Sequence, residues 1–131
     1  MPPPRHAAPM RALYICLLYL AGPWVLLRLW RRGRRQPEYR QRIGERLGRV
    51  AAPRQPIAVW VHAVSVGESL AAAPLIEALL ARHGDGRVWV TTTTPTGSAR
   101  VLARFGNRVH HSYAPYDWPG AVRRFVGRVQ P

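Results

Sequence analysis

Residues 57–63 read IAVWVHA and residues 87–93 read RVWVTTT, two short runs of β-branched and aromatic residues that predict β-strands. An Ala- and Leu-rich segment from 68 to 82 lies between them and predicts a helix. The alternation then continues, with a helix expected over 95–105, a strand over 108–113 and a helix over 117–128. Strands that alternate with helices through short connections are typical of a parallel sheet joined by right-handed crossovers. The sequence therefore predicts an α/β fold, with half of a Rossmann-like domain over residues 57–131.

The expected helices carry signals for their ends and their buried faces. Thr94 should cap the second helix, with Pro95 at the first helical position. Asp117 should cap the third, and Pro74 should kink the first or mark its true start. The buried face of the first helix is expected to consist of Leu75, Ile76, Leu79 and Leu80.

Two loops follow the carboxyl ends of the first two strands, residues 64–68 and 93–97, where sheets of this kind bind ligands. In the first loop, Glu68 opens a helix and could act as a general base toward an acceptor hydroxyl. Ser65 and Glu68 also have the spacing of a capping box, and spacing alone favours that structural role. The two roles are compatible, because a helix amino terminus favours the ionised carboxylate. Gly67 would allow a tight turn, and the amides near it could hold a phosphate.

The sequence lacks the motifs that common nucleotide and metal sites require. It has no G-x-G-x-x-G and no G-x-x-x-x-G-K-[ST], which argues against dinucleotide and P-loop sites. His62, His110 and His111 do not have H-E-x-x-H spacing, and the single Cys16 can form neither a thiolate cage nor an internal disulfide. We therefore expect no metal and no cofactor.

The charge of the chain points to an anionic partner. Its 131 residues include 20 basic residues, all of them Arg, and only six acids, for a net charge of +14. Phospholipid headgroups, a phosphorylated glycolipid and nucleic acid all fit that charge. Nucleic acid is the weakest of the three, because the arginines cluster beside an apolar run and no base-stacking or finger motif is present.

That apolar run, ALYICLLYLAGPWVLLRLW over residues 12–30, follows a tail of residues 1–11 and predicts a membrane-anchor helix. Nineteen helical residues barely cross a bilayer, and Gly22-Pro23 would kink the helix, so a half-inserted anchor is an alternative to a spanning one. Trp30-Arg31-Arg32 after the run argues against signal-peptide cleavage. The arginines that close the run place the rest of the chain in the cytoplasm by the positive-inside rule: Arg28, Arg31, Arg32, Arg34 and Arg35.

Residues 31–56 form a basic connector between the anchor and the first strand. Its middle predicts a short amphipathic helix, with Tyr39, Ile43 and Leu47 on one face and Arg42, Arg46 and Arg49 on another. Such a helix would rest on anionic headgroups or grip a phosphorylated lipid. A solvated charged linker is the alternative, because Gly44 and Gly48 weaken a helix.

Four blocks of the sequence together resemble the 3-deoxy-D-manno-octulosonic acid (Kdo) transferases of lipopolysaccharide synthesis. They occur in that family's order, after an apolar anchor: PEYRQRIGERLG (37–48), WVHAVSVGE (60–68), VTTTTPTGSARV (90–101) and YAPYDWPGAVRRF (113–125). The resemblance implies the amino-terminal part of a two-domain glycosyltransferase of the GT-B type at the inner membrane, with the donor-binding carboxyl-terminal domain absent. It also implies that this part alone is inactive.

The resemblance further implies the substrates and the site. The donor would be CMP-Kdo, the acceptor the lipid A precursor lipid IVA, and the reaction inverting and metal-independent. Glu68 would be the general base. Residues expected to contact the acceptor or shape its loops are Ser65, Gly67, Thr94, Thr96, Gly97, Arg42 and Arg46. The alternative is a membrane-tethered module that binds anionic glycolipid without catalysis, in which Glu68 is only a cap.

Overall fold

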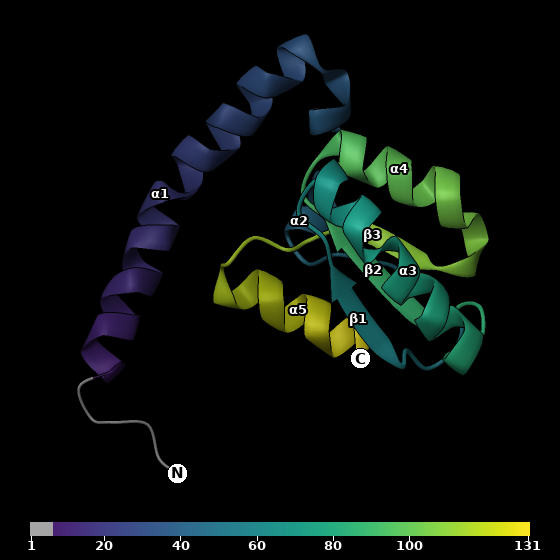
Figure 1. Ribbon diagram of the computed structural model, residues 1–131. Helices are drawn as coiled ribbons and strands as arrows, with labels where there is room; N and C mark the ends of the chain where they lie inside the picture. The colour runs from purple at the N-terminus through teal and green to yellow at the C-terminus, as the bar shows by residue number, and fades with distance from the viewer. Residues whose placement is uncertain (1–6) are drawn as a thin grey trace.

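The computed structural model describes residues 7–131, in which a long helix stands beside an α/β body (Figure 1). The α-helices and strands are α1 (Ala7–Arg35), α2 (Ile43–Arg46), β1 (Val59–His62), α3 (Val66–His83), β2 (Val88–Thr92), α4 (Pro95–Phe105), β3 (His110–Tyr113) and α5 (Pro119–Val129). Two 3-10 helices, η1 and η2, cover Pro37–Arg40 and Gly106–Arg108.

The three strands form the predicted parallel sheet, in the order β1-β2-β3. Side chains alternate across the central strand, so Val88 and Val90 pack under α3 and α4 while Trp89 packs with Phe125 of α5. Helices therefore cover both faces of the sheet (Figure 1), which confirms the α/β prediction. The loops after the carboxyl ends of the strands are where folds of this kind position a site.

Three local predictions about the helices need correction. Of the two alternatives for Pro74, a helix start is wrong, because α3 begins at Val66 and contains Pro74; a kink there stays a prediction. Leu75 is 55% exposed, since the buried positions of α3 follow the spacing of Ala73, Ile76 and Leu80. Asp117 does not cap α5, because Trp118 occupies the capping position without a side-chain bond.

The prediction of a single amphipathic helix around residues 39–47 is wrong. The 3-10 helix η1 ends at Arg40, and Arg42 takes a left-handed backbone conformation with φ of 58° before α2 begins. The chain then turns into the α/β body, where Arg46 and Val50 are buried. Tertiary packing has overridden the helical spacing, so the second half of the connector is part of the domain.

Helix α1 is longer than predicted and packs against the body. It continues through Pro23, and by length and composition it could cross a membrane. The indole Nε1 of Trp118 donates to the carbonyl oxygen of Leu18 at 3.0 Å, and the Trp118 ring lies against Gly22. Near the start of the helix, the hydroxyl of Tyr14 donates to Asp117 at 3.0 Å. Residues 14–22 of α1 therefore lie beside the loop that precedes α5.

Candidate functional site

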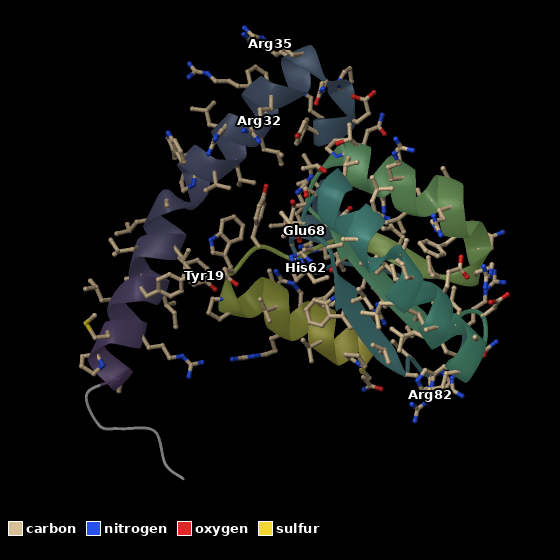
Figure 2. The ribbon with its side chains drawn as sticks, viewed as in Figure 1. Tyr19, Arg32, Arg35, His62, Glu68 and Arg82 are labelled. Carbon is tan, nitrogen blue, oxygen red and sulfur yellow. The ribbon has the colours of Figure 1, made fainter. Side chains whose placement is uncertain are left out.

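The two loops predicted to bind ligand meet at the carboxyl edge of the sheet. Thr93 donates to the carbonyl oxygen of Val64 twice, from its backbone nitrogen at 3.2 Å and from its hydroxyl at 2.8 Å. These bonds join the loop after β2 to the loop that carries Glu68. In Figure 2, Glu68 and His62 lie on the side of the body that faces α1.

Glu68 sits in the capping box that its spacing predicts. The Oγ of Ser65 accepts from the backbone nitrogen of Glu68 at 3.4 Å, and Glu68 Oε2 accepts from the backbone nitrogen of Val64 at 2.9 Å. The side chain is exposed, and within residues 7–131 its Oε1 has no hydrogen-bond partner. One carboxylate oxygen thus serves the cap, while the other is free to accept a proton.

The second loop opens α4 as predicted. Thr94 Oγ1 accepts from the backbone nitrogen of Gly97 at 3.1 Å, and the hydroxyl of Thr96 donates to it at 3.4 Å. A Cβ on Gly97 would lie 3.0 Å from Thr94 Oγ1 and 3.6 Å from the carbonyl carbon of Ser65. The tight contact is therefore with the Thr94 cap, whereas the distance to the Glu68 loop is an ordinary van der Waals contact.

Gly67 does not make the tight turn expected of it. It lies in the first turn of α3, its φ is not positive, and a Cβ there would meet nothing nearer than Ser65 Oγ at 3.9 Å. The geometry gives no steric reason for glycine at this position.

Arg42 is held in a network inside the domain. Its guanidinium donates to Glu45 at 2.9 Å, to Ser98 Oγ at 3.0 Å and to His111 Nδ1 at 3.2 Å. Glu45 also accepts from the backbone nitrogen of Tyr113 at 2.8 Å, which ties the connector to the end of β3. Contact between Arg42 and an acceptor stays a prediction.

His111, in the same network, is neutral in the folded protein. Burial, followed by the charge of Arg42, lowers the pKa of His111 from 6.5 to about 4. Arg42 donates to Nδ1, so we assign the ring proton to Nε2, which lies 3.0 Å from Thr92 Oγ1.

The low pKa of His111 predicts that acid destabilises the fold. The unfolded chain binds a proton at this residue near pH 6.5 and the folded chain only near pH 4, so this stabilisation is complete above pH 6.5 and lost as the pH falls through 4. We expect a loss of about 3 kcal/mol, measured by urea unfolding between pH about 7 and about 4. His111→Gln should show a smaller slope, and His83→Gln, at the far end of α3, should keep the wild-type slope. Equal slopes in all three proteins would contradict the assignment.

Arg46 is the most unusual side chain in this region. It is 3% exposed, its guanidinium lies 4.1 Å from the centre of the Tyr113 ring, and within residues 7–131 no carboxylate pairs with it. Its Nε and Nη2 are buried and make no hydrogen bond to the described residues. Each buried unsatisfied donor costs about 1–3 kcal/mol, and Arg cannot shed its charge.

Arg46 forms part of the wall of a cavity of about 230 Å³ between α1 and the carboxyl edge of the sheet. The cavity brings Arg46 together with Thr94, as the sequence predicted for an acceptor site, and is lined by Val25, Arg28, Leu29, Arg32, Tyr39, Arg46, Thr93, Thr94 and Tyr116. Burial raises the pKa of Tyr116, so its hydroxyl stays protonated. The sequence did not place Arg28, Arg32 or Tyr116 in a site, because the packing of α1 on the body leaves no periodic signal.

The three histidines considered as metal ligands make separate contacts. His111 belongs to the Arg42 network, and His62 Nδ1 lies 2.9 Å from Thr91 Oγ1. His110 stacks on Trp89, with 5.0 Å between ring centres. In the part of the chain that the structure describes, no three His, Cys, Asp or Glu residues come together to hold a metal ion.

Comparison with known proteins gives consistent matches. The family model described as 3-deoxy-D-manno-octulosonic-acid transferase (kdotransferase) matches residues 41–131. The chain is 41% identical over 124 residues to the 3-deoxy-D-manno-octulosonic acid transferase of Haemophilus influenzae, covering 92% of this chain and 29% of that protein. It is also 41% identical over 130 residues to the enzyme of the same name from Bordetella pertussis, covering 92% of this chain and 30% of that protein.

A plant protein named probable 3-deoxy-D-manno-octulosonic acid transferase, mitochondrial, from Arabidopsis thaliana, is 37% identical over 121 residues, covering 91% of this chain and 27% of that protein. The chain thus spans less than a third of the length of these relatives. No solved structure matches it.

Proposed function

Because this chain belongs to the 3-deoxy-D-manno-octulosonic-acid transferase family of glycosyltransferases, we propose that it forms the acceptor side of an enzyme that transfers Kdo from CMP-Kdo to lipid IVA. The observation that carries the proposal is the position of Glu68. Its carboxylate is exposed at the carboxyl edge of the sheet, and its loop is bonded to the loop that borders the basic cavity. Ligands of open parallel sheets bind at this edge.

In the proposed mechanism, Glu68 Oε1 takes the proton from a sugar hydroxyl of the acceptor. That oxygen attacks the anomeric carbon of Kdo, the new carbon–oxygen bond forms, and the bond to the phosphate of CMP breaks with inversion. The electron pair of that bond leaves with CMP. Val64 and Ser65 hold the Glu68 side chain and its helix in place while this happens, through the capping box.

The experiment is a transfer assay with the intact protein in detergent, CMP-Kdo and lipid IVA, read by mass spectrometry. We expect a product heavier by one or more Kdo residues, and a chelator should leave its yield unchanged because the proposal needs no metal. A protein that binds lipid IVA but forms no product would support the second candidate, a glycolipid-binding module in which Glu68 serves only its observed cap.

We also propose that α1 lies in the cytoplasmic face of the inner membrane instead of crossing it. Spanning would draw Asp117 and Arg123 into the hydrocarbon, because both line a surface cavity together with Arg11 and Tyr14 of α1. The other side of α1 carries apolar side chains that could enter the membrane: Leu13, Leu17, Leu20, Trp24 and Leu27.

A single cysteine near the start of α1 tests this location. Met10 is 70% exposed, and we expect Met10→Cys, in a Cys16→Ser background, to resist a membrane-impermeant maleimide applied from the periplasm. In inside-out vesicles, where the reagent reaches the cytoplasmic face, the cysteine at position 10 should be labelled fully. Labelling from the periplasmic side would show that α1 spans the membrane.

A further inference from the structure

Arg46 carries a positive charge into the interior without an anionic partner. The one acid beside it in sequence, Glu45, is engaged by Arg42 and by the backbone nitrogen of Tyr113. Tyr113 offers Arg46 only its ring face, and the Nε and Nη2 donors have no acceptor among residues 7–131. Because buried guanidinium groups are normally paired, the missing partner indicates that Arg46 binds a further group.

The cavity beside Arg46 has the chemistry of an anion site. Arg28 and Arg32 of α1 line the side opposite the sheet edge, and no acid lines the cavity. Neither of these arginines pairs with a carboxylate within the described residues; their guanidiniums lie over the rings of Trp24 and Tyr39, respectively. Four hydroxyl-bearing residues also line the cavity: Tyr39, Thr93, Thr94 and Tyr116.

The size and the donors of the cavity define the class of ligand. A volume of about 230 Å³ holds a tetrahedral oxyanion with its first waters. Planar guanidinium donors match the oxygens of a phosphate, and a phosphate monoester carries close to two charges at neutral pH.

We propose that this cavity binds a phosphate monoester on the membrane-borne sugar acceptor, with Arg46 as its central donor and Arg28 and Arg32 closing on it from α1. The assignment to the acceptor rests on the proposed function. The bonds from Thr93 to Val64 connect the phosphate site to the Glu68 loop, so a bound phosphate fixes where the sugar lies relative to the carboxylate. Arg46 is therefore a substrate-binding residue in this proposal.

The proposal gives Arg46→Met two opposite effects. An unliganded buried charge destabilises the fold, so an apolar side chain of similar length should leave the melting temperature equal or higher. The same change should abolish stabilisation by phosphate. If Arg46 were purely structural, Arg46→Met would lower the melting temperature and leave any stabilisation by phosphate unchanged.

The first test is thermal unfolding of the intact protein in detergent, with inorganic phosphate against sodium chloride at equal ionic strength. We expect phosphate to raise the melting temperature of the wild type and of the control Arg49→Met, which changes an exposed arginine of the same segment. Arg46→Met should show no rise, and Arg32→Gln, on exposed α1, a reduced one. Equal rises in all four proteins would overturn the proposal, and the Arg32→Gln result decides it if Arg46→Met does not fold.

The second test identifies the source of the phosphate. Vesicles with phosphatidic acid, a monoester, should compete with inorganic phosphate, whereas vesicles with the diester phosphatidylglycerol should not. In transfer assays, Arg46→Met should raise KM for the phosphorylated acceptor about 10- to 100-fold with little change in kcat, and leave KM for a dephosphorylated acceptor unchanged. If the wild-type protein transferred to both acceptors with the same KM, the phosphate site would be refuted and the proposed function would stand. A phosphate shift without any transfer would refute the proposed function and leave the phosphate site standing.

Discussion

Glu68→Gln in the intact protein is expected to lower the rate of Kdo transfer by about 10²- to 10⁴-fold while acceptor binding and folding stay unchanged. Glutamine fits the capping box, because its amide oxygen can accept from the backbone nitrogen of Val64 as Glu68 Oε2 does. Ser65 Oγ still accepts from the backbone nitrogen of residue 68. The substitution therefore removes the proton acceptor and keeps the cap.

Rates are measured under single-turnover conditions at saturating CMP-Kdo, and binding by titration with lipid IVA. Glu77→Gln is the matched control, since Glu77 lies on the same helix and makes only an exposed ion pair with Arg108 at 3.1 Å. We expect Glu77→Gln to transfer at the wild-type rate. A Glu68→Gln protein that also transfers at that rate would refute the general base and leave Glu68 as a cap.

Gly48→Ala is expected to destabilise the fold by about 2–5 kcal/mol. Gly48 has a φ of +79°, where an L side chain costs about 1–2 kcal/mol. A Cβ there would also collide with the carbonyl oxygen of Ala121 in α5, and backbone shifts of this kind cost about 1–3 kcal/mol more. The turn at Gly48 sets the contact between the connector and α5, where Arg124 donates to the carbonyl oxygen of Leu47 at 3.0 Å.

Urea unfolding of the two variants Gly48→Ala and Gly44→Ala separates the effect of this clash from the general effect of replacing glycine with alanine. Gly44 lies in α2 without a positive φ, and a Cβ there would meet nothing closer than 3.8 Å. Alanine at 44 should leave stability equal or slightly higher, because it favours helix. Similar losses at both positions would contradict the proposed packing.

The sheet and its helices could be predicted because their signals are local. The bounds of α4 agree to the residue, since Thr94 and Pro95 define its start and Gly106 follows its end. The strands were predicted two or three residues too long, because the residues that flank them carry no local signal that marks where pairing in the sheet stops. The capping box at Ser65 and Glu68 was likewise visible from spacing alone.

The basic cavity could not be predicted from spacing. Arg46 occupies a polar position in a helical pattern, and only the left-handed turn at Arg42 brings it into the interior. The cavity's far wall comes from Arg28 and Arg32, which the sequence presents simply as charges closing an apolar run. Their role depends on α1 folding back on the body, a contact made through Trp118 that has no local signal.

A structure of the intact protein with lipid IVA bound tests the role of Glu68 most directly. We expect the reactive sugar hydroxyl within about 2.6–3.2 Å of a Glu68 carboxylate oxygen, with a phosphate of the same acceptor hydrogen-bonded to Arg46. An acceptor whose hydroxyls all lie beyond reach of Glu68, with that side chain still closed on the backbone nitrogen of Val64, would contradict it.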